Sequence, residues 1–108
     1  MKKFNVFSYG TLKDKSVLKK VCGKVFPKKE AYIKGFKYVL LSPYPMIKKV
    51  DSDNIIEGEI LFSVDEKSLM RMDYYEDEGE IYKRIKVQAI LKSTGEKIPC
   101  FVYVECEK

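Results

Sequence analysis

Apolar and polar residues alternate through most of this chain, a pattern typical of half-buried β-strands. Clusters of turn-forming residues at 51–54 and 93–96 separate the alternating segments. The second cluster joins two long segments and therefore predicts a hairpin. Together the pattern predicts strands over residues 4–8, 31–33, 36–41, 46–50, 56–62, 81–91 and 98–104.

Two segments have apolar residues at helical rather than strand spacing. In residues 14–22 apolar side chains recur every three to four positions, and Gly23 follows as a stop signal. The second predicted helix covers residues 65–76. Ser63 and Glu66 have the spacing of a capping box, so we expect them to begin this helix.

The order of elements is a strand, a helix, several strands, a second helix and a hairpin. Many strands with only two short helices predict the α+β class, as a small mixed β-barrel with the two helices packed on it. Closing the sheet would also remove its exposed edges. The length of 108 residues is that of one domain, covering residues 1–108.

The composition excludes several kinds of chemistry. Histidine is absent, which rules out serine–histidine and cysteine–histidine catalysis and removes the usual metal ligand. The three cysteines, at positions 22, 100 and 106, have neither metal-binding nor redox spacing. We therefore expect no metal site, and acid–base chemistry falls to carboxylates, lysines or tyrosines.

Charge and hydropathy predict a cytoplasmic protein without a membrane partner. No apolar run approaches the roughly 18 residues of a membrane-spanning helix, and the first residues lack the apolar segment of a secretory signal. The net charge is +5, which could attract nucleic acid. The lysines are scattered, often as pairs, so a solvated surface is the preferred interpretation.

Glu76 is the main candidate for chemistry. Helical rotation returns it to within roughly 20° of Leu69, seven residues earlier, so it lies on the stripe that Leu69 and Met72 would bury. A carboxylate facing a core is costly unless it is paired or functional. Burial and neighbouring carboxylates would raise its pKa and favour proton exchange near neutral pH. An acidic helix end left in solvent is the alternative, and it explains Asp77 and Glu78 better.

The turn after the first strand, Tyr9-Gly10-Thr11-Leu12, is a candidate binding site. Glycine lets the backbone turn sharply, and successive N–H groups at such a turn form a concavity for an anion. A helix that begins shortly afterwards would add its positive end. The functional hypothesis is a cradle for a carboxylate or a developing oxyanion. An ordinary turn between a strand and a helix is the alternative.

Three tyrosines are further candidates for substrate binding. Tyr44 stands between two prolines, Tyr82 lies in the long strand before the hairpin, and Tyr103 lies in the last strand. Tyrosines can line a small pocket and hydrogen-bond a ligand. Packing in the core with the hydroxyl at its rim would explain them equally.

Six short blocks cover nearly the whole chain in a specific order. They are FSYGTLK at 7–13, PYP at 43–45, EGE at 57–59, MDYYE at 72–76, YKR at 82–84 and CFVY at 100–103. In this order and spacing they resemble the gamma-glutamylcyclotransferase-like superfamily, most closely its small members similar to gamma-glutamylamine cyclotransferase and the plant avirulence-induced proteins. The superfamily often has glycine directly after the glutamate, whereas here Gly79 lies three positions later.

The resemblance implies a compact barrel and a cyclotransferase that releases 5-oxoproline and an amine from a small gamma-glutamyl substrate. It implies that Glu76 is the proton acceptor and that the backbone of residues 9–12 holds the glutamyl end. No cofactor is expected, because attack within one molecule already gains from proximity. We further expect no nucleic-acid partner, and a monomer or a homodimer.

Two alternatives to this enzyme remain open from the sequence. A binding module would hold a small anion or metabolite in the same pocket without turnover, and ligand-induced thermal stabilisation without product would favour it. A barrel that binds nucleic acid through its basic surface would have an affinity that falls steeply with salt.

Overall fold

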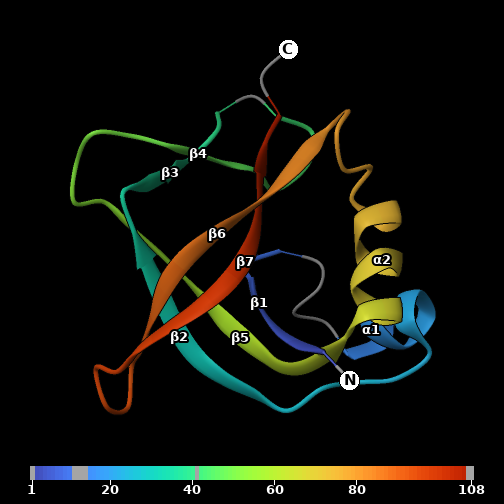
Figure 1. The fold of residues 1–108 in the computed structure, drawn as a ribbon. Coiled ribbons are helices and arrows are strands. Elements are labelled where there is room, and N and C mark those ends of the chain that lie inside the picture. Colours follow the sequence, from blue (N-terminus) through green and yellow to red (C-terminus); the bar gives the residue numbers. More distant parts are fainter. Residues whose placement is uncertain (1, 11–14, 41, 107–108) are drawn as a thin grey trace.

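In the computed structural model, which describes residues 2–10, 15–40 and 42–106, five strands close into a barrel (Figure 1). Neighbouring strands are antiparallel, except that β1 and β7 pair in parallel through Val6 and Phe101 and so close the ring. The predicted mixed β-barrel of the α+β class is confirmed. Around the barrel the strands are β1 (Lys3–Ser8), β5 (Ile55–Asp65), β2 (Lys28–Lys34), β6 (Tyr82–Leu91) and β7 (Lys97–Glu105).

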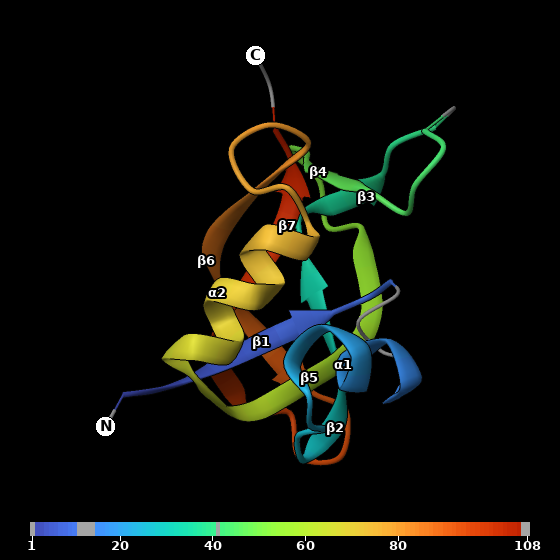
Figure 2. The same cartoon turned by 90° about the vertical axis from the view of Figure 1, so that its right-hand side faces the viewer.

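Two helices, α1 (Lys15–Cys22) and α2 (Glu66–Tyr75), lie next to each other over one side of the barrel (Figure 2). A separate two-stranded sheet of β3 (Phe36–Tyr38) and β4 (Ile47–Lys49) lies near the upper end of the barrel in Figure 1. β3 is shorter than the predicted strand over 36–41. The chain there turns into a segment whose prolines cannot donate to a sheet ladder.

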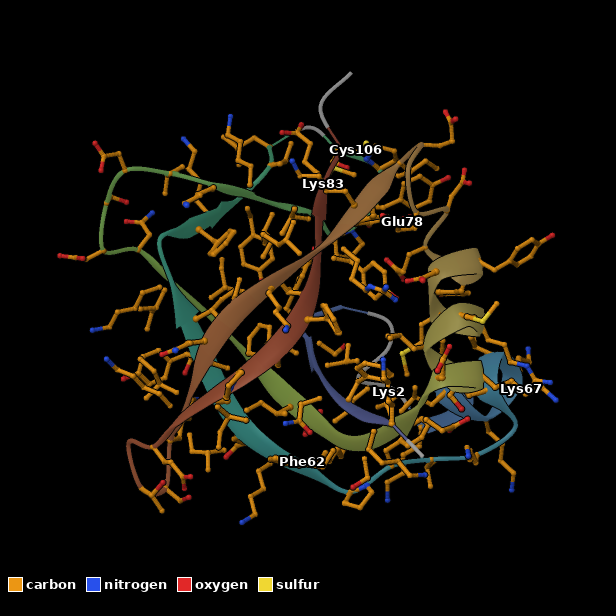
Figure 3. All side chains as sticks on the ribbon, in the orientation of Figure 1. Lys2, Phe62, Lys67, Glu78, Lys83 and Cys106 are labelled. Atoms are coloured by element: carbon orange, nitrogen blue, oxygen red, sulfur yellow. The ribbon has the colours of Figure 1, made fainter. Side chains whose placement is uncertain are left out.

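The side chains of the strands point alternately to the two faces of the sheet and form two hydrophobic layers, one inside the barrel and one beneath the helices (Figure 3). In β1, Phe7 belongs to the cluster inside the barrel, whereas its neighbour Val6 belongs to the cluster shared with the helices. Successive strand residues point to opposite faces, so one strand serves both layers. The layer beneath the helices also contains Leu18, Leu69 and Met72, all buried.

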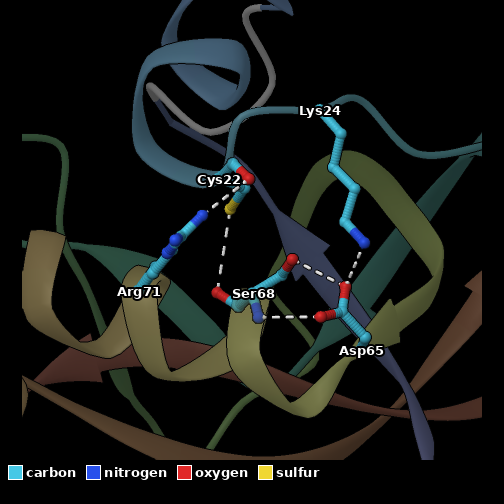
Figure 4. A network of polar contacts seen from close by, with 5 residues as sticks. All are labelled: Cys22, Lys24, Asp65, Ser68 and Arg71. Carbon is cyan, nitrogen blue, oxygen red and sulfur yellow. Dashed lines mark hydrogen bonds and ion pairs between the residues drawn. The ribbon is translucent and has the colours of Figure 1, made fainter.

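The start of α2 differs from the predicted capping box of Ser63 and Glu66. Asp65 is the N-cap: its carboxylate accepts hydrogen bonds from the Ser68 N–H at 3.2 Å and the Ser68 hydroxyl at 2.6 Å (Figure 4). It also pairs with Lys24 at 2.7 Å, and these contacts hold the pKa of Asp65 well below its usual range. A carboxylate at this position also interacts favourably with the positive end of the helix. Ser63, with φ 59°, lies instead in β5 beside a register shift against β1.

The end of α1 is fixed to α2 at the same place. The Arg71 guanidinium donates a hydrogen bond to the Cys22 carbonyl at 3.1 Å, so a helix C-terminal oxygen gains a charged donor (Figure 4). Gly23 follows with φ 76°, a conformation that glycine adopts without strain. The predicted stop at Gly23 is confirmed.

Gly58 allows β1 to approach β5 closely. A Cβ atom at this position would lie 2.3 Å from the Ser8 carbonyl oxygen and 2.8 Å from Cζ of Phe7. The first contact involves backbone, so no side-chain rotation relieves it. The missing side chain at Gly58 therefore determines how closely the end of β1, and with it Tyr9, lies against the barrel.

Replacing Gly58 by alanine is expected to destabilise the protein by about 3 kcal/mol, the upper part of the usual range for overpacking. Gly95→Ala is the matched control: Gly95 has open space around it and a φ of 75°, so only backbone strain of about 1 kcal/mol applies. Chemical denaturation of both variants measures the two free energies of unfolding. A loss in Gly58→Ala no larger than that in Gly95→Ala would contradict the close approach.

Candidate active site

A hollow of about 300 Å³ opens between the end of β1, the proline segment, the C-terminal end of α2 and the strands β6 and β7. Its volume is in the range of sites that bind small molecules. The hollow is lined by Phe7, Ser8, Tyr9, Gly10, Tyr44, Pro45, Tyr75, Glu76, Asp77, Ile81, Tyr82 and Tyr103.

The structure brings together most of the residues that the sequence singled out. Six of the eight line this one hollow, although they come from five separate parts of the chain. The other two, Thr11 and Leu12, lie outside the described residues. The six are Tyr9, Gly10, Tyr44, Glu76, Tyr82 and Tyr103.

Glu76 is the C-cap residue of α2, and its N–H donates to the Met72 carbonyl at 2.9 Å. Leu69 and Met72, on the same helical stripe, are buried, and Glu76 is half-buried where the stripe reaches the hollow. Within the described residues no hydrogen bond or ion pair of its carboxylate is present. Burial raises the pKa of Glu76 to about 7, so the carboxyl group exchanges its proton near neutral pH.

The residue after Glu76 has an unusual backbone. Asp77 has φ 53°, in the left-handed region, which glycine adopts freely and aspartate more readily than most residues. In the superfamily pattern described above, this position is often glycine. Here an aspartate adopts the left-handed backbone conformation that glycine would adopt freely. Although exposed, Asp77 lines the hollow; the sequence had assigned it to the solvent.

The hydroxyls of Tyr9 and Tyr82 donate their protons to backbone carbonyls of the protein. The Tyr9 hydroxyl donates to the Tyr103 carbonyl at 2.6 Å, and the Tyr82 hydroxyl donates to the Pro45 carbonyl at 2.5 Å. Burial raises the pKa of Tyr82 to about 12 and that of Tyr9 further above its ordinary value, so both remain neutral. A hydroxyl that donates its proton in this way can still accept a hydrogen bond at its oxygen.

Asp73, one turn before Glu76, joins α2 to two strands of the barrel. One carboxylate oxygen accepts from the Tyr103 hydroxyl at 2.6 Å, and the other pairs with Arg84 at 2.7 Å. Burial, followed by the hydrogen bond to Asp73, raises the pKa of Tyr103 far above its ordinary value. Each oxygen of Asp73 therefore has a donor, whereas within the described residues the carboxylate of Glu76 on the same helix has none.

Sequence reasoning missed other residues of the hollow. Ser8 and Pro45 lie in the blocks at 7–13 and 43–45, so those blocks could have indicated them. Ile81 had no signal in the sequence. It reaches the hollow because the turn after α2 leads directly into β6.

Possible metal ligands do not converge in the described part of the chain. Across residues 2–10, 15–40 and 42–106, no group of three cysteine, aspartate or glutamate side chains is arranged to hold a metal ion. The expectation that no cofactor is needed stays a prediction. The helices described in the structure are too short and too polar to cross a membrane.

Comparison with known proteins agrees with this geometry. The sequence pattern of the family "Gamma-glutamyl cyclotransferase, AIG2-like" matches residues 6–108. The chain belongs to this family. The resemblance predicted from the six sequence blocks is thereby confirmed.

Individual members of the gamma-glutamyl cyclotransferase, AIG2-like family are similar over most of this chain. Protein AIG2 C from Arabidopsis thaliana is 28% identical over 106 residues, which are 96% of this chain and 62% of that protein. The chain thus spans less than two thirds of that curated relative.

Solved structures share the fold. A protein from Arabidopsis thaliana, determined in solution, superposes with a TM-score of 0.87 at 25% identity and covers 100% of this chain and 72% of its own. The crystal structure of an AIG2-like protein from Mus musculus has a TM-score of 0.81 at 24% identity, with 98% of this chain and 79% of that chain covered. The barrel with two helices is therefore the architecture of these relatives.

Tyr103→Phe is expected to destabilise the fold by about 1.5–3 kcal/mol, because a buried hydrogen bond to a charged group is lost. Tyr74→Phe is the matched control, since Tyr74 is 90% exposed and its variant is expected to stay within about 0.5 kcal/mol of the original. Thermal or chemical unfolding measures both. Equal stabilities of the two variants would show that the contact with Asp73 contributes little.

Glu76→Gln is expected to make the protein more stable at pH 8. The folded-state pKa of about 7 exceeds the ordinary 4.5, so the folded state binds more protons between these values and its stability falls as pH rises through them. Glutamine removes this loss of stability. We expect the free energy of unfolding to rise on the order of 1–2 kcal/mol at pH 8, a value discounted for the partial exposure of the side chain, and to stay unchanged at pH 4. Unfolding free energies across this range measure the effect. Glu96→Gln, in the exposed turn before β7, is the control; a parallel pH profile for Glu76→Gln and this control would contradict the buried carboxylate.

Proposed function

We propose that this member of the family is a gamma-glutamyl cyclotransferase in which Glu76 is the general acid and base. The observation that supports this most directly is the Glu76 carboxylate, half-buried in the hollow, with a pKa raised to about 7. A base of this pKa is ionised often enough at neutral pH to take a proton and acidic enough to return it.

In the proposed reaction, the substrate's α-ammonium group gives a proton to Glu76. The freed nitrogen then attacks the side-chain carbonyl carbon of the same glutamyl unit, forming the C–N bond of a five-membered ring and an oxyanion. As the oxyanion collapses, the original amide C–N bond breaks and Glu76 returns its proton to the leaving nitrogen. The ring nitrogen, which holds two protons after the attack, gives up one of them as the lactam forms, and the released amine takes it up to leave as an ammonium ion. The products are 5-oxoproline and the amine; no water is consumed.

The tyrosines suit the nitrogen end of such a substrate. An ammonium group has only donors, and the Tyr82 oxygen in the hollow can accept because its own proton binds the Pro45 carbonyl. The Tyr9 hydroxyl also donates to a carbonyl, and its oxygen, which already accepts from the Ile47 backbone, would offer its remaining acceptor capacity. Tyr9 directly follows β1 and Tyr82 is the first residue of β6, so the substrate amine would be held between the end of β1 and the start of β6. Tyr44 and Tyr103 would supply further walls.

The turn after β1 is proposed to hold the carboxylate or the oxyanion through backbone N–H groups. Gly10 lines the hollow, and a Cβ there would lie 3.4 Å from Cβ of Pro45. A side chain at this position would therefore fill the space between β1 and the proline segment. The proposed share of Thr11 and Leu12 follows from the sequence pattern.

The activity is tested by incubating the protein with gamma-glutamyl amines and gamma-glutamyl dipeptides and measuring 5-oxoproline and free amine, expected in equal amounts. In Glu76→Gln we expect kcat to fall by about 10²–10⁴-fold, because the positioned base is lost. Activity of the original protein should rise with pH up to about 7, as Glu76 ionises. Glu96→Gln, far from the hollow in sequence and exposed, should keep full activity.

Undiminished turnover in Glu76→Gln would refute the assignment of the base. Thermal stabilisation by gamma-glutamyl compounds without any product would favour the binding module over the enzyme.

A further inference from the structure

A second hollow, of about 650 Å³, lies between α1 and α2 and shares Tyr75 with the lining of the proposed active site. We call it the helix groove. Its lining combines three cations with apolar side chains. The residues that define it are Lys20 and Val21 of α1 and Lys67, Met70, Arg71, Tyr74 and Tyr75 of α2, of which Tyr75 also lines the proposed active site.

The α2 residues of the helix groove form one continuous helical stripe. They are spaced by three and four positions, so they lie along one face over roughly 10 Å. Lys67 points away from the barrel (Figure 3). Met70 is 64% exposed and Tyr74 is 90% exposed, so both stand at the surface. A small ligand is usually mostly enclosed by its site, and it would leave these two side chains uncovered.

The cations of the helix groove have no acidic partner among the residues that the structure describes. Among the ion pairs within the described residues, none involves Lys20, Lys67 or Arg71, and no carboxylate lines the groove. The hydrogen bond from Arg71 to the Cys22 carbonyl holds that guanidinium beside the groove (Figure 4). The surface thus has an apolar centre and a rim of positive charge that no described carboxylate pairs with.

The apolar centre and positive rim of the helix groove favour one kind of binding partner. A second copy of the chain, docked through the same surface, would place like charges opposite each other. A concave groove between two helices accommodates the ridge of a third helix, with apolar anchors at the spacing of Met70 and Tyr74. We propose that the helix groove binds an amphipathic helix of a partner protein, with apolar residues on the face toward the groove and acidic residues on its flanks.

The test uses fluorescence anisotropy with a labelled 18-residue helical peptide that has leucines on one face and glutamates elsewhere. We expect saturable binding to the full chain that weakens as salt is added. Binding should weaken at least tenfold in Met70→Ser/Tyr74→Ser and in Lys20→Glu/Lys67→Glu. Lys83→Glu/Lys97→Glu, which makes the same charge change on exposed residues of β6 and β7, should bind as the original does.

Several outcomes would overturn the proposal. These are no binding of the glutamate peptide, equal binding of a matched peptide with lysine in place of glutamate, or equal losses in the groove and control variants. Binding of phosphatidylserine vesicles, but not of the peptide, with the same dependence on groove residues would assign the surface to a membrane instead. None of the substituted residues lines the proposed active site, so failure here leaves the cyclotransferase test unaffected.

Discussion

The position of α2 on the barrel depends on the Asp73 carboxylate. It binds Tyr103 of β7 with one oxygen and Arg84 of β6 with the other, at 2.6 and 2.7 Å. Arg84 and Tyr103 are directly paired in the β6–β7 ladder, so one carboxylate holds two adjacent strands. Charge-assisted hydrogen bonds of this kind are short and directional. They fix the last turn of the helix, and that turn ends in Glu76.

Tyr103, which donates to Asp73, also connects to the side of the hollow formed by the end of β1. The Tyr103 carbonyl accepts the Tyr9 hydroxyl, so β1 is connected through Tyr103 to the helix. Gly58 allows β1 to come close enough for this, because any Cβ there would collide with the Ser8 carbonyl. The hollow is therefore bounded by elements that share hydrogen bonds, and its shape follows from the barrel closure.

Much of this arrangement was predictable, and the reasons are local. Alternation identifies β1, β6 and β7, since buried strands have a period of two. The helical stripe of Leu69 and Met72 identifies the side on which Glu76 lies, because a helix turns by a fixed angle for each residue.

What could not be predicted depends on contacts between distant residues. Asp65 replaces Ser63 as the cap because β5 stays paired with β1 as far as Asp65, and this pairing joins residues far apart in the chain. The pairing of Asp73 with Arg84 and Tyr103 requires the β6–β7 register, which no periodicity specifies. The close approach at Gly58 requires knowing that β1 and β5 are neighbours.

Asp73 and Glu76 show how one helix end serves both structure and chemistry. Asp73 has two strong donors, the Tyr103 hydroxyl and the Arg84 guanidinium, and they fix its carboxylate between the helix and the barrel. Glu76 is oriented without such donors: its N–H binds Met72, and the turn that follows is closed by the Ile81 N–H on the Asp77 carbonyl at 3.0 Å. Backbone hydrogen bonds thus aim the side chain while leaving its oxygens uncommitted. A side-chain donor would favour the ionised form and lower the pKa, so the lack of one in the described residues is what suits Glu76 to gaining and losing a proton.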